Sequence, residues 1–156
     1  MKSPEQSQQP DVQAFEDALR QSGMAGALRF LSERTAHRFT GVFRFDGDTL
    51  RSVALVDKWL PEVTRGDDVP LAEAYCAHLK GAVEPLVVTD GRTDPRTPWM
   101  TQSGVASYCG AVIRDDAGEA WGALCHFDPE PCESKHSAIP LLAAAAALFH
   151  RVAIKG

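Results

Sequence analysis

The sequence contains no long run of basic residues. Its 16 Lys and Arg residues are outnumbered by 21 Asp and Glu residues, which gives a formal net charge of −5, and charges of both signs are interspersed along the chain. A protein that binds nucleic acid needs a basic stripe to contact phosphates. We therefore expect no nucleic-acid partner.

Long apolar runs are also missing. The longest one, residues 139–149, is too short and too rich in Ala to cross a bilayer unaided. The first ten residues, MKSPEQSQQP, contain no apolar segment of the kind that secretory signals carry. These two absences predict no membrane association and a cytoplasmic location.

No C-x-x-C pair occurs among the four cysteines, which are Cys76, Cys109, Cys125 and Cys132. Free cysteine is often a buried core residue, so reduced thiols are favoured for all four. A zinc site would need two close pairs of ligands. Cys125 and His126 have suitable chemistry, but adjacent residues of a strand point to opposite faces of a sheet. No metal ion is expected.

The 156 residues suffice for one domain with a substantial core. Residues 1–10 are polar and include two prolines but no large apolar side chain beyond Met1, which predicts a flexible tail. A single domain is therefore expected over residues 11–156.

The clearest pair of strands spans residues 105–128. Asp115 and Gly118 occupy the positions where a tight turn favours a side-chain acceptor and a left-handed residue. If Asp115 faces Gly118, one face of the hairpin carries the pairs Val112–Trp121, Gly110–Ala123, Tyr108–Cys125 and Ala106–Phe127, and the other carries Ile113–Ala120, Ala111–Gly122, Cys109–Leu124 and Ser107–His126. A one-residue bulge at the turn would exchange these partners.

Both faces of this hairpin are largely apolar, so both are expected to be covered. A helical layer on one side and a ligand cavity on the other would satisfy that pattern. A second hairpin is predicted over residues 39–56. Side chains of two kinds alternate along residues 39–45, which is typical of a strand, and residues 49–56 form the returning strand after the turn at Gly47. Two helices are expected before it, over residues 11–23 and 25–35.

The middle of the chain is less regular. Residues 57–69 form a charged loop that contains Trp59, and a short helix is predicted from Pro70 to Gly81. Its inner face would carry Leu71, Tyr75 and either His78 or Leu79. A strand is expected over residues 86–89, followed by a long loop over residues 90–104 in which Trp99 and Met100 serve as anchors.

The last predicted element is a helix that begins at Ser134 or Ser137, tolerates Pro140 in its first turn and ends near Ala153. It has two apolar stripes. The first consists of Ile139, Leu142, Ala146, Phe149 and Ala153, and the second of Leu141, Ala145, Leu148 and Val152. One stripe would serve the core and the other a partner helix.

This order of elements resembles a GAF domain, a small sensory module of signalling proteins. The resemblance is carried by SYCGAVIRDDAGEAWGALCHFD from Ser107, by PLAEAYCAHL from Pro70 and by EPLVVTDGRTDPR from Glu84. It covers residues 14–153. The chain is most similar to the stand-alone single-domain GAF proteins of bacteria.

The resemblance implies an α+β fold in which an antiparallel sheet carries the N- and C-terminal helices on one face and a ligand pocket on the other. It also implies a regulatory role in signal transduction, with a small molecule bound non-covalently and a homodimer formed through the terminal helices. A separate signalling protein would be a further partner. No other cofactor is expected.

Residues that combine apolar walls with a few polar groups are the candidates for lining this pocket. They are Phe43, Trp59, Tyr75, Cys76, His78, Tyr108, Cys109 and His126. We assign none of them a catalytic role, so the chain is not expected to be an enzyme.

Other subclasses of GAF domain carry characteristic residues at known places in the fold. Covalent bilin attachment would need a cysteine in the segment before Val105, and residues 98–104 contain none. The Asn-Lys-x-Phe-x-Asp-Glu type of motif of cyclic-nucleotide-binding members is also missing. The free methionine sulfoxide reductases use several cysteines. One of them would fall near Cys76, but the others would fall in the loop before Val105, where this sequence has none.

Two alternatives to a small-molecule sensor stay open. One is a thiol-based redox enzyme or sensor that uses Cys76 or Cys109. The other is a protein-interaction scaffold whose pocket is filled by its own side chains.

Overall fold

The computed structural model describes residues 4–96, 104–133 and 139–155. They form one six-stranded antiparallel sheet with the strand order β3-β2-β1-β6-β5-β4. The elements are helices α1 (Pro4–Ser32) and α2 (Ile139–Phe149), strands β1 (Phe39–Asp46), β2 (Thr49–Asp57), β3 (Val69–Pro70), β4 (Leu86–Val88), β5 (Ser107–Arg114) and β6 (Ala120–Asp128), the 3-10 turns η1 (Leu71–Glu73) and η2 (Tyr75–Leu79), and the π-helical turn η5 (His150–Lys155). Trp99, Met100, Ser134 and Ser137 lie outside the described residues.

The two predicted hairpins belong to one layer. β1 pairs with β2 through the turn at Gly47, β5 pairs with β6 through the turn at Gly118, and β1 lies antiparallel to β6. Both glycines have the positive φ that these turns require, 60° and 81°. The α+β fold with two covered sheet faces is therefore confirmed.

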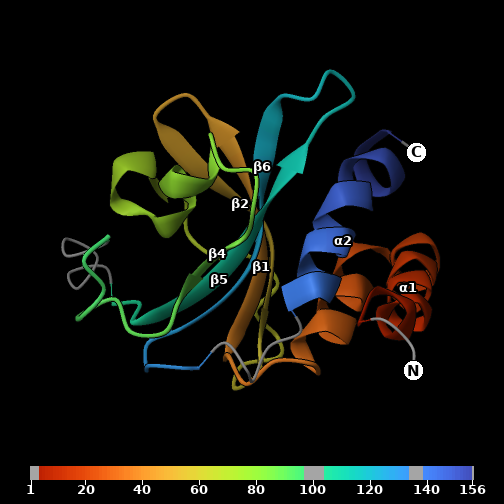
Figure 1. The fold of residues 1–156 in the computed structure, drawn as a ribbon, viewed down its shortest axis with the longest axis horizontal. Helices are drawn as coiled ribbons and strands as arrows, with labels where there is room; N and C mark the ends of the chain where they lie inside the picture. Colours follow the sequence, from red (N-terminus) through yellow and green to blue (C-terminus); the bar gives the residue numbers. More distant parts are fainter. Residues whose placement is uncertain (1–3, 97–103, 134–138, 156) are drawn as a thin grey trace.

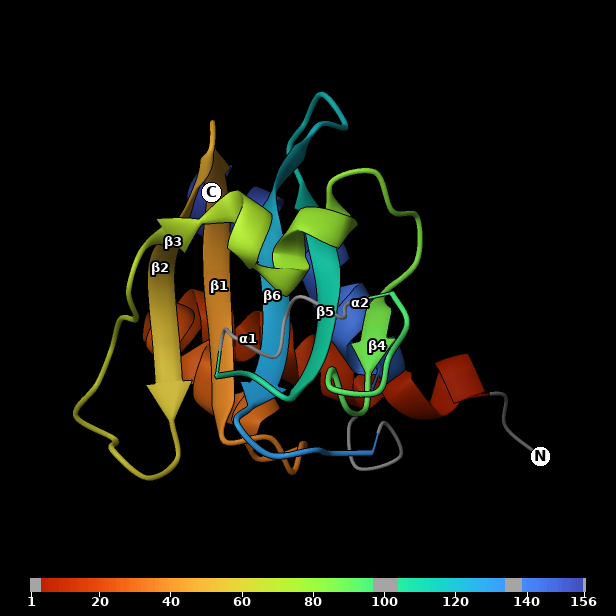
Figure 2. The same ribbon diagram turned by 90° about the vertical axis from the view of Figure 1, so that its left-hand side faces the viewer.

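Helices α1 and α2 cover one face of the sheet, and the segment with η1 and η2 crosses the opposite face (Figures 1 and 2). α1 is interrupted at Gly23, whose φ of 70° and ψ of −169° are not helical, so it consists of the two helices expected from the sequence. Residues 4–10, predicted as a flexible tail, are helical. They contain Glu and Gln residues with good helix propensity, and Pro4 stands in the first turn, where proline is tolerated.

Both stripes of α2 are buried within this one chain. Leu142, Ala146 and Phe149 from the first stripe are buried, and so are Leu141, Ala145, Leu148 and Val152 from the second. α2 packs on β5 with one side and on α1 with another. The helix that the second stripe was expected to need is therefore α1 of the same chain.

The register of the central hairpin differs from the predicted one by two residues, because two single-residue steps add up. The amide of Asp115 donates to the carbonyl of Glu119, so the turn is one residue longer than expected. A bulge then leaves Trp121 as an extra residue, since Arg114 faces Ala120 and Ile113 faces Gly122.

The first step alone would move every side chain of β6 to the opposite face of the sheet relative to β5. The second step returns them to the predicted faces. Gly110 consequently lies opposite Cys125, and Tyr108 lies opposite Phe127. Only Ala120 and Trp121, at the bulge, change sides: Ala120 faces Arg114 instead of Ile113. Trp121 packs in the helix-side core, against Phe149.

The short helix predicted after Pro70 is not continuous. Val69 and Pro70 pair with β2 as strand β3, and two 3-10 turns follow, separated by Ala74 in an extended conformation. The segment must leave the sheet edge and cross the sheet, which overrides the helix propensity of its residues. Of the two residues left open on its inner face, Leu79 is buried and His78 is exposed.

Among residues 4–96, 104–133 and 139–155, no helix combines the length and the apolarity that a bilayer span requires.

The contact between β6 and β1 depends on a glycine. A Cβ atom at residue 122 would lie 2.1 Å from the carbonyl oxygen of Phe43, which is backbone and cannot rotate away. We expect Gly122→Ala to destabilise the fold by more than about 2 kcal/mol, because overpacking here must displace a central strand. Urea unfolding measures this. Gly81→Ala is the control, since a Cβ there meets nothing within 4 Å, and equal stability of the two variants would contradict the prediction.

Candidate functional site

A cleft of about 850 Å³ lies on the sheet face opposite the helices. Its floor is formed by cleft-facing residues of β1, β5 and β6, its roof by residues 72–76 of η1 and η2, and its wall by residues 66–69. The lining residues are Phe43, Leu50, Leu55, Gly66, Asp67, Val69, Ala72, Glu73, Ala74, Tyr75, Cys76, Val105, Tyr108, Cys125 and Phe127. The lining is mostly apolar, with carboxylates at its edge and a thiol and phenol group inside.

Glycines leave room for the two tyrosines of this site. A Cβ at residue 110 would lie 2.2 Å from the Tyr108 hydroxyl oxygen, and a Cβ at residue 91 would lie 2.0 Å from that of Tyr75. Tyr108 therefore lies along its strand over Gly110. The two phenol rings stack, with centroids 5.1 Å apart and an interplanar angle of 14°, and the Tyr75 hydroxyl donates to the carbonyl of Val105 at 2.9 Å.

Tyr108 brings two thiols together. Its hydroxyl lies 3.1 Å from Cys76 Sγ, and its ring covers Gly110, the residue directly opposite Cys125. Hydrogen bonds from the Cys125 thiol and from the Tyr108 hydroxyl lower the pKa of Cys76, although burial opposes them. Burial raises the pKa of Cys125 and that of Tyr108. Cys76 is thus the member of this cluster that most readily becomes a thiolate.

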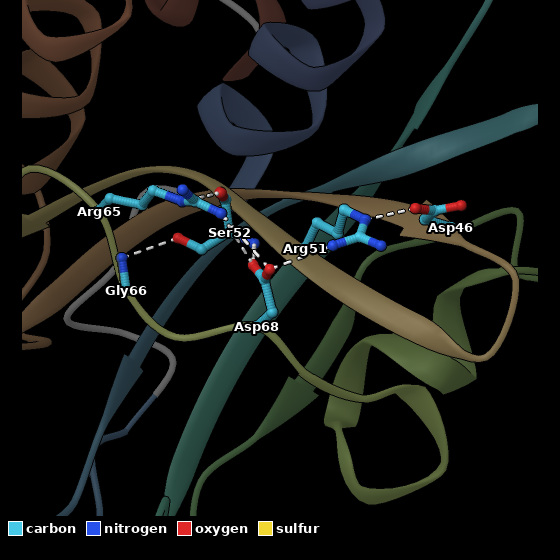
Figure 3. Close-up of polar contacts among 6 residues, drawn as sticks. All are labelled: Asp46, Arg51, Ser52, Arg65, Gly66 and Asp68. Atoms are coloured by element: carbon cyan, nitrogen blue, oxygen red, sulfur yellow. Dashed lines mark hydrogen bonds and ion pairs between the residues drawn. The ribbon is translucent and has the colours of Figure 1, made fainter.

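The wall is fixed to strand β2 by a polar network (Figure 3). Asp68 Oδ1 accepts the amide of Ser52 at 2.9 Å and the Arg65 guanidinium at 3.2 Å, and the Ser52 hydroxyl accepts the amide of Gly66 at 2.8 Å. Arg51 joins this network by bonding both Asp68 and Asp46. The Ser52 amide, followed by Arg65 and Arg51, lowers the pKa of Asp68. These bonds hold Gly66 and Asp67 at the cleft.

The structure brings four of the eight predicted pocket residues together in the cleft: Phe43, Tyr75, Cys76 and Tyr108. Sequence reasoning missed Cys125 and Phe127 among the lining residues. The signal was available, because the alternation of the last strand places both on the same face as Tyr108.

The other four predicted residues lie elsewhere. His78 is exposed on η2. Trp59 is 72% exposed. The Arg38 guanidinium lies over its indole, with Arg38 Cζ 4.1 Å from the centroid of the Trp59 ring. Cys109 and His126 are buried on the helix side of the sheet, because each is adjacent in its strand to a residue that faces the cleft.

His126 belongs to a buried polar cluster. Its Nδ1 lies 2.7 Å from the Thr40 hydroxyl, and its ring stacks on His37 with centroids 5.9 Å apart. Desolvation, followed by the charges of His37 and Lys58, lowers the pKa of His126 to about 3. Desolvation lowers the pKa of His37 to about 4 despite the nearby Asp128. Both imidazoles are neutral near neutral pH. Within the described part of the chain, no three His, Cys, Asp or Glu side chains converge in a way that could hold a metal ion.

Comparison with known proteins now decides the family. A family model described as GAF domain matches residues 20–152. The chain belongs to the GAF domain family. A comparison with curated protein sequences finds no significant match.

Solved structures with the same fold include GAF domains and reductases. A putative GAF sensor protein from Burkholderia vietnamiensis is 15% identical with a TM-score of 0.70, and the match covers 99% of this chain and 98% of that one. The GAF domain of an Acinetobacter phosphoenolpyruvate-protein phosphotransferase is 12% identical with a TM-score of 0.74, covering 99% and 96%. The free methionine-R-sulfoxide reductase of Neisseria meningitidis is 14% identical with a TM-score of 0.71, covering 97% and 90%. These identities establish the fold alone.

The two buried imidazoles predict a pH dependence of stability for this GAF domain. Their folded pKa values of about 4 and about 3 lie below the value of 6.5 expected for the unfolded chain. The unfolded state therefore binds the protons first, and stability falls as the pH drops from 6.5 toward those values. At about pH 5 each imidazole lowers the free energy of unfolding by roughly 2 kcal/mol relative to about pH 7.

Urea unfolding at several pH values measures this dependence. In the double variant His37→Gln and His126→Gln the loss of stability between about pH 7 and pH 5 should shrink, because the two imidazoles that cause it are absent. Carboxylates stay ionised above about pH 5 and add little to the loss in this range. His78→Gln, which changes an exposed histidine, should leave the loss unchanged. A double variant with the wild-type pH dependence would contradict the assignment.

Proposed function

We propose that this GAF domain is a regulatory module in signal transduction that binds a small molecule non-covalently in the cleft. The carrying observation is the cleft itself. Its volume of about 850 Å³ falls in the range of about 300–1,000 Å³ that is typical of small-molecule sites. An open cleft also favours this function over a scaffold whose pocket is filled by its own side chains.

The lining favours a ligand with an apolar, largely flat body. Phe43, Tyr108 and Phe127 offer aromatic surface on the floor, and the stacked ring of Tyr75 closes one side. Asp67 and Glu73 are exposed where the cleft opens. Hydrogen-bond donors on the ligand would be oriented toward these two carboxylates.

Signalling requires that occupancy changes the helical layer. β5 and β6 contribute to both sides: Tyr108 and Cys125 line the cleft, while Cys109 and Leu124 pack with α1 and α2. A shift of these strands would therefore reach the helices through adjacent residues. A ligand with different affinity for two helix arrangements would shift their populations. We further propose that two copies associate through the outer face of this layer, where Ile154 is 41% exposed, and that a separate signalling protein receives the output.

The first test is binding in the cleft. Native mass spectrometry of the freshly purified protein identifies a co-purified small molecule, and calorimetry gives its dissociation constant. Ala72 lines the roof and is exposed, so Ala72→Trp should fill the cleft and weaken binding at least about tenfold. Ala117→Trp is the matched control, because Ala117 is exposed on the β5–β6 turn.

Equal affinity of the compound for Ala72→Trp and the wild type would place its site elsewhere. The signalling part has its own readout. Ligand-saturated protein should differ from free protein in hydrogen exchange of α1 and α2 and in its dimer dissociation constant. If neither changes, the domain binds a ligand without reporting it.

A thiol-dependent reductase is the second candidate. Two observations favour it: Cys76 lies inside the cleft beside Tyr108, and structures similar to this one include free methionine-R-sulfoxide reductases. Such an enzyme needs an activated thiolate that reaches the substrate and a resolving thiol that reaches the oxidised cysteine. We expect no reductase activity, because the other cysteines that the resemblance to these enzymes implies would fall just before Val105, and residues 98–104 contain none.

The test is turnover of free methionine-R-sulfoxide with a thiol reductant. Wild-type protein should consume no more sulfoxide than the Cys76→Ser variant. Turnover by the wild type that is lost in Cys76→Ser would replace the sensor with the enzyme.

A further inference from the structure

We propose that Cys76 and Cys125 form a dithiol site in the cleft that a hydroperoxide oxidises to a disulfide and a thiol reductant restores. This goes beyond ligand binding and does not depend on it. The two cysteines are far apart in sequence, and the fold brings them to one cavity.

The geometry that places them together has three parts. Cys76 descends from η2 to the floor, where its Sγ lies 3.1 Å from the Tyr108 hydroxyl. The Tyr108 ring lies over Gly110, and Gly110 is the cross-strand partner of Cys125. Directly opposite residues of an antiparallel pair have Cα atoms only about 5 Å apart. Both sulfur-bearing side chains therefore meet at the Tyr108 hydroxyl.

The surroundings give the two thiols different roles. Hydrogen bonding with Cys125 and with the Tyr108 hydroxyl lowers the pKa of Cys76, which favours the thiolate there. The single S–H proton of Cys125 has the Gly41 carbonyl oxygen, at 3.7 Å, as its other acceptor, and burial raises the pKa of this thiol. Cys76 is accordingly the attacking group and Cys125 the resolving group. Cys109 cannot replace either one, because it is buried on the helix side of the sheet.

The reaction proceeds in two balanced steps. Cys76 thiolate attacks the terminal oxygen of the hydroperoxide, the O–O bond breaks, and the departing alkoxide takes a proton, leaving a sulfenic acid on Cys76. Cys125 then loses its proton and attacks the Cys76 sulfur. The S–O bond breaks, and the hydroxide leaves as water. The two cysteines supply two electrons, and the peroxide is reduced to an alcohol and water.

A disulfide here would change the cleft. Its S–S bond of about 2.05 Å draws η2 toward β6, and η2 follows the roof residues that cover the cavity. It would also remove the Tyr108 hydroxyl from its partner on Cys76. Oxidation would therefore narrow the cleft where a ligand would lie against Tyr108.

The test uses the full chain with hydrogen peroxide and with tert-butyl hydroperoxide. Free thiols counted after denaturation should fall from four to two, and peptide mapping should find Cys76 joined to Cys125. Dithiothreitol should restore both thiols. The double variant Cys109→Ser and Cys132→Ser should still form the same link.

Two variants test the roles. Cys125→Ser should stop at the sulfenic acid, which dimedone traps on Cys76. Tyr108→Phe should slow oxidation at least about fivefold, because the thiolate loses a hydrogen-bond donor, while its thermal unfolding reports whether the fold is intact. The proposal is overturned if all four thiols survive, if links form only through Cys132, or if Cys76 is oxidised further while Cys125 remains free in the wild type.

Discussion

The structure depends on one constraint, the alternation of side chains across a single antiparallel sheet. Each strand of the central hairpin supplies both faces, so neighbouring residues serve different purposes. Toward the helices the strands present Val42, Ile113 and Leu124, which are fully buried against α1 and α2. Toward the cleft they present small residues or aromatic rings that lie flat over glycines. The first face is filled and the second is left hollow.

The cleft combines a fixed frame with a more lightly held roof. Its floor is continuous with the paired strands, and its wall is fixed to β2 through Ser52 and Asp68. The roof consists of two short 3-10 turns joined at an extended residue, which have weaker internal hydrogen bonding than a helix. Cys76 belongs to this roof, whereas Cys125 and Tyr108 belong to the floor. Chemistry at this thiol pair therefore acts between the two parts of the cleft that differ most in rigidity.

Much of the fold could be predicted from the sequence, because periodicity reports which face a residue occupies. Both hairpins, the break at Gly23 and the faces of Tyr108 and Cys125 follow from local patterns. The cross-strand partners could not be predicted, since a bulge at Trp121 has no sequence signal strong enough to fix it. Alternation also separates Tyr108 from Cys109, and a prediction that put both in one pocket set this rule aside. Trp59, His78 and His126 were chosen for their chemistry alone, and their positions depend on tertiary contacts with Arg38, solvent and His37.

The long turn and the bulge of the β5–β6 hairpin shift the register by one residue each, and together they return the strands to the original faces. The faces of β5 and β6 are therefore set by the pairing of the strands and not by the length of the exposed tip. Residues added between Asp116 and Ala117 would lengthen the loop and leave the cleft surface as it is. A slip of β6 past β5 by one residue would instead exchange the cleft surface of β6 with its helix-side surface.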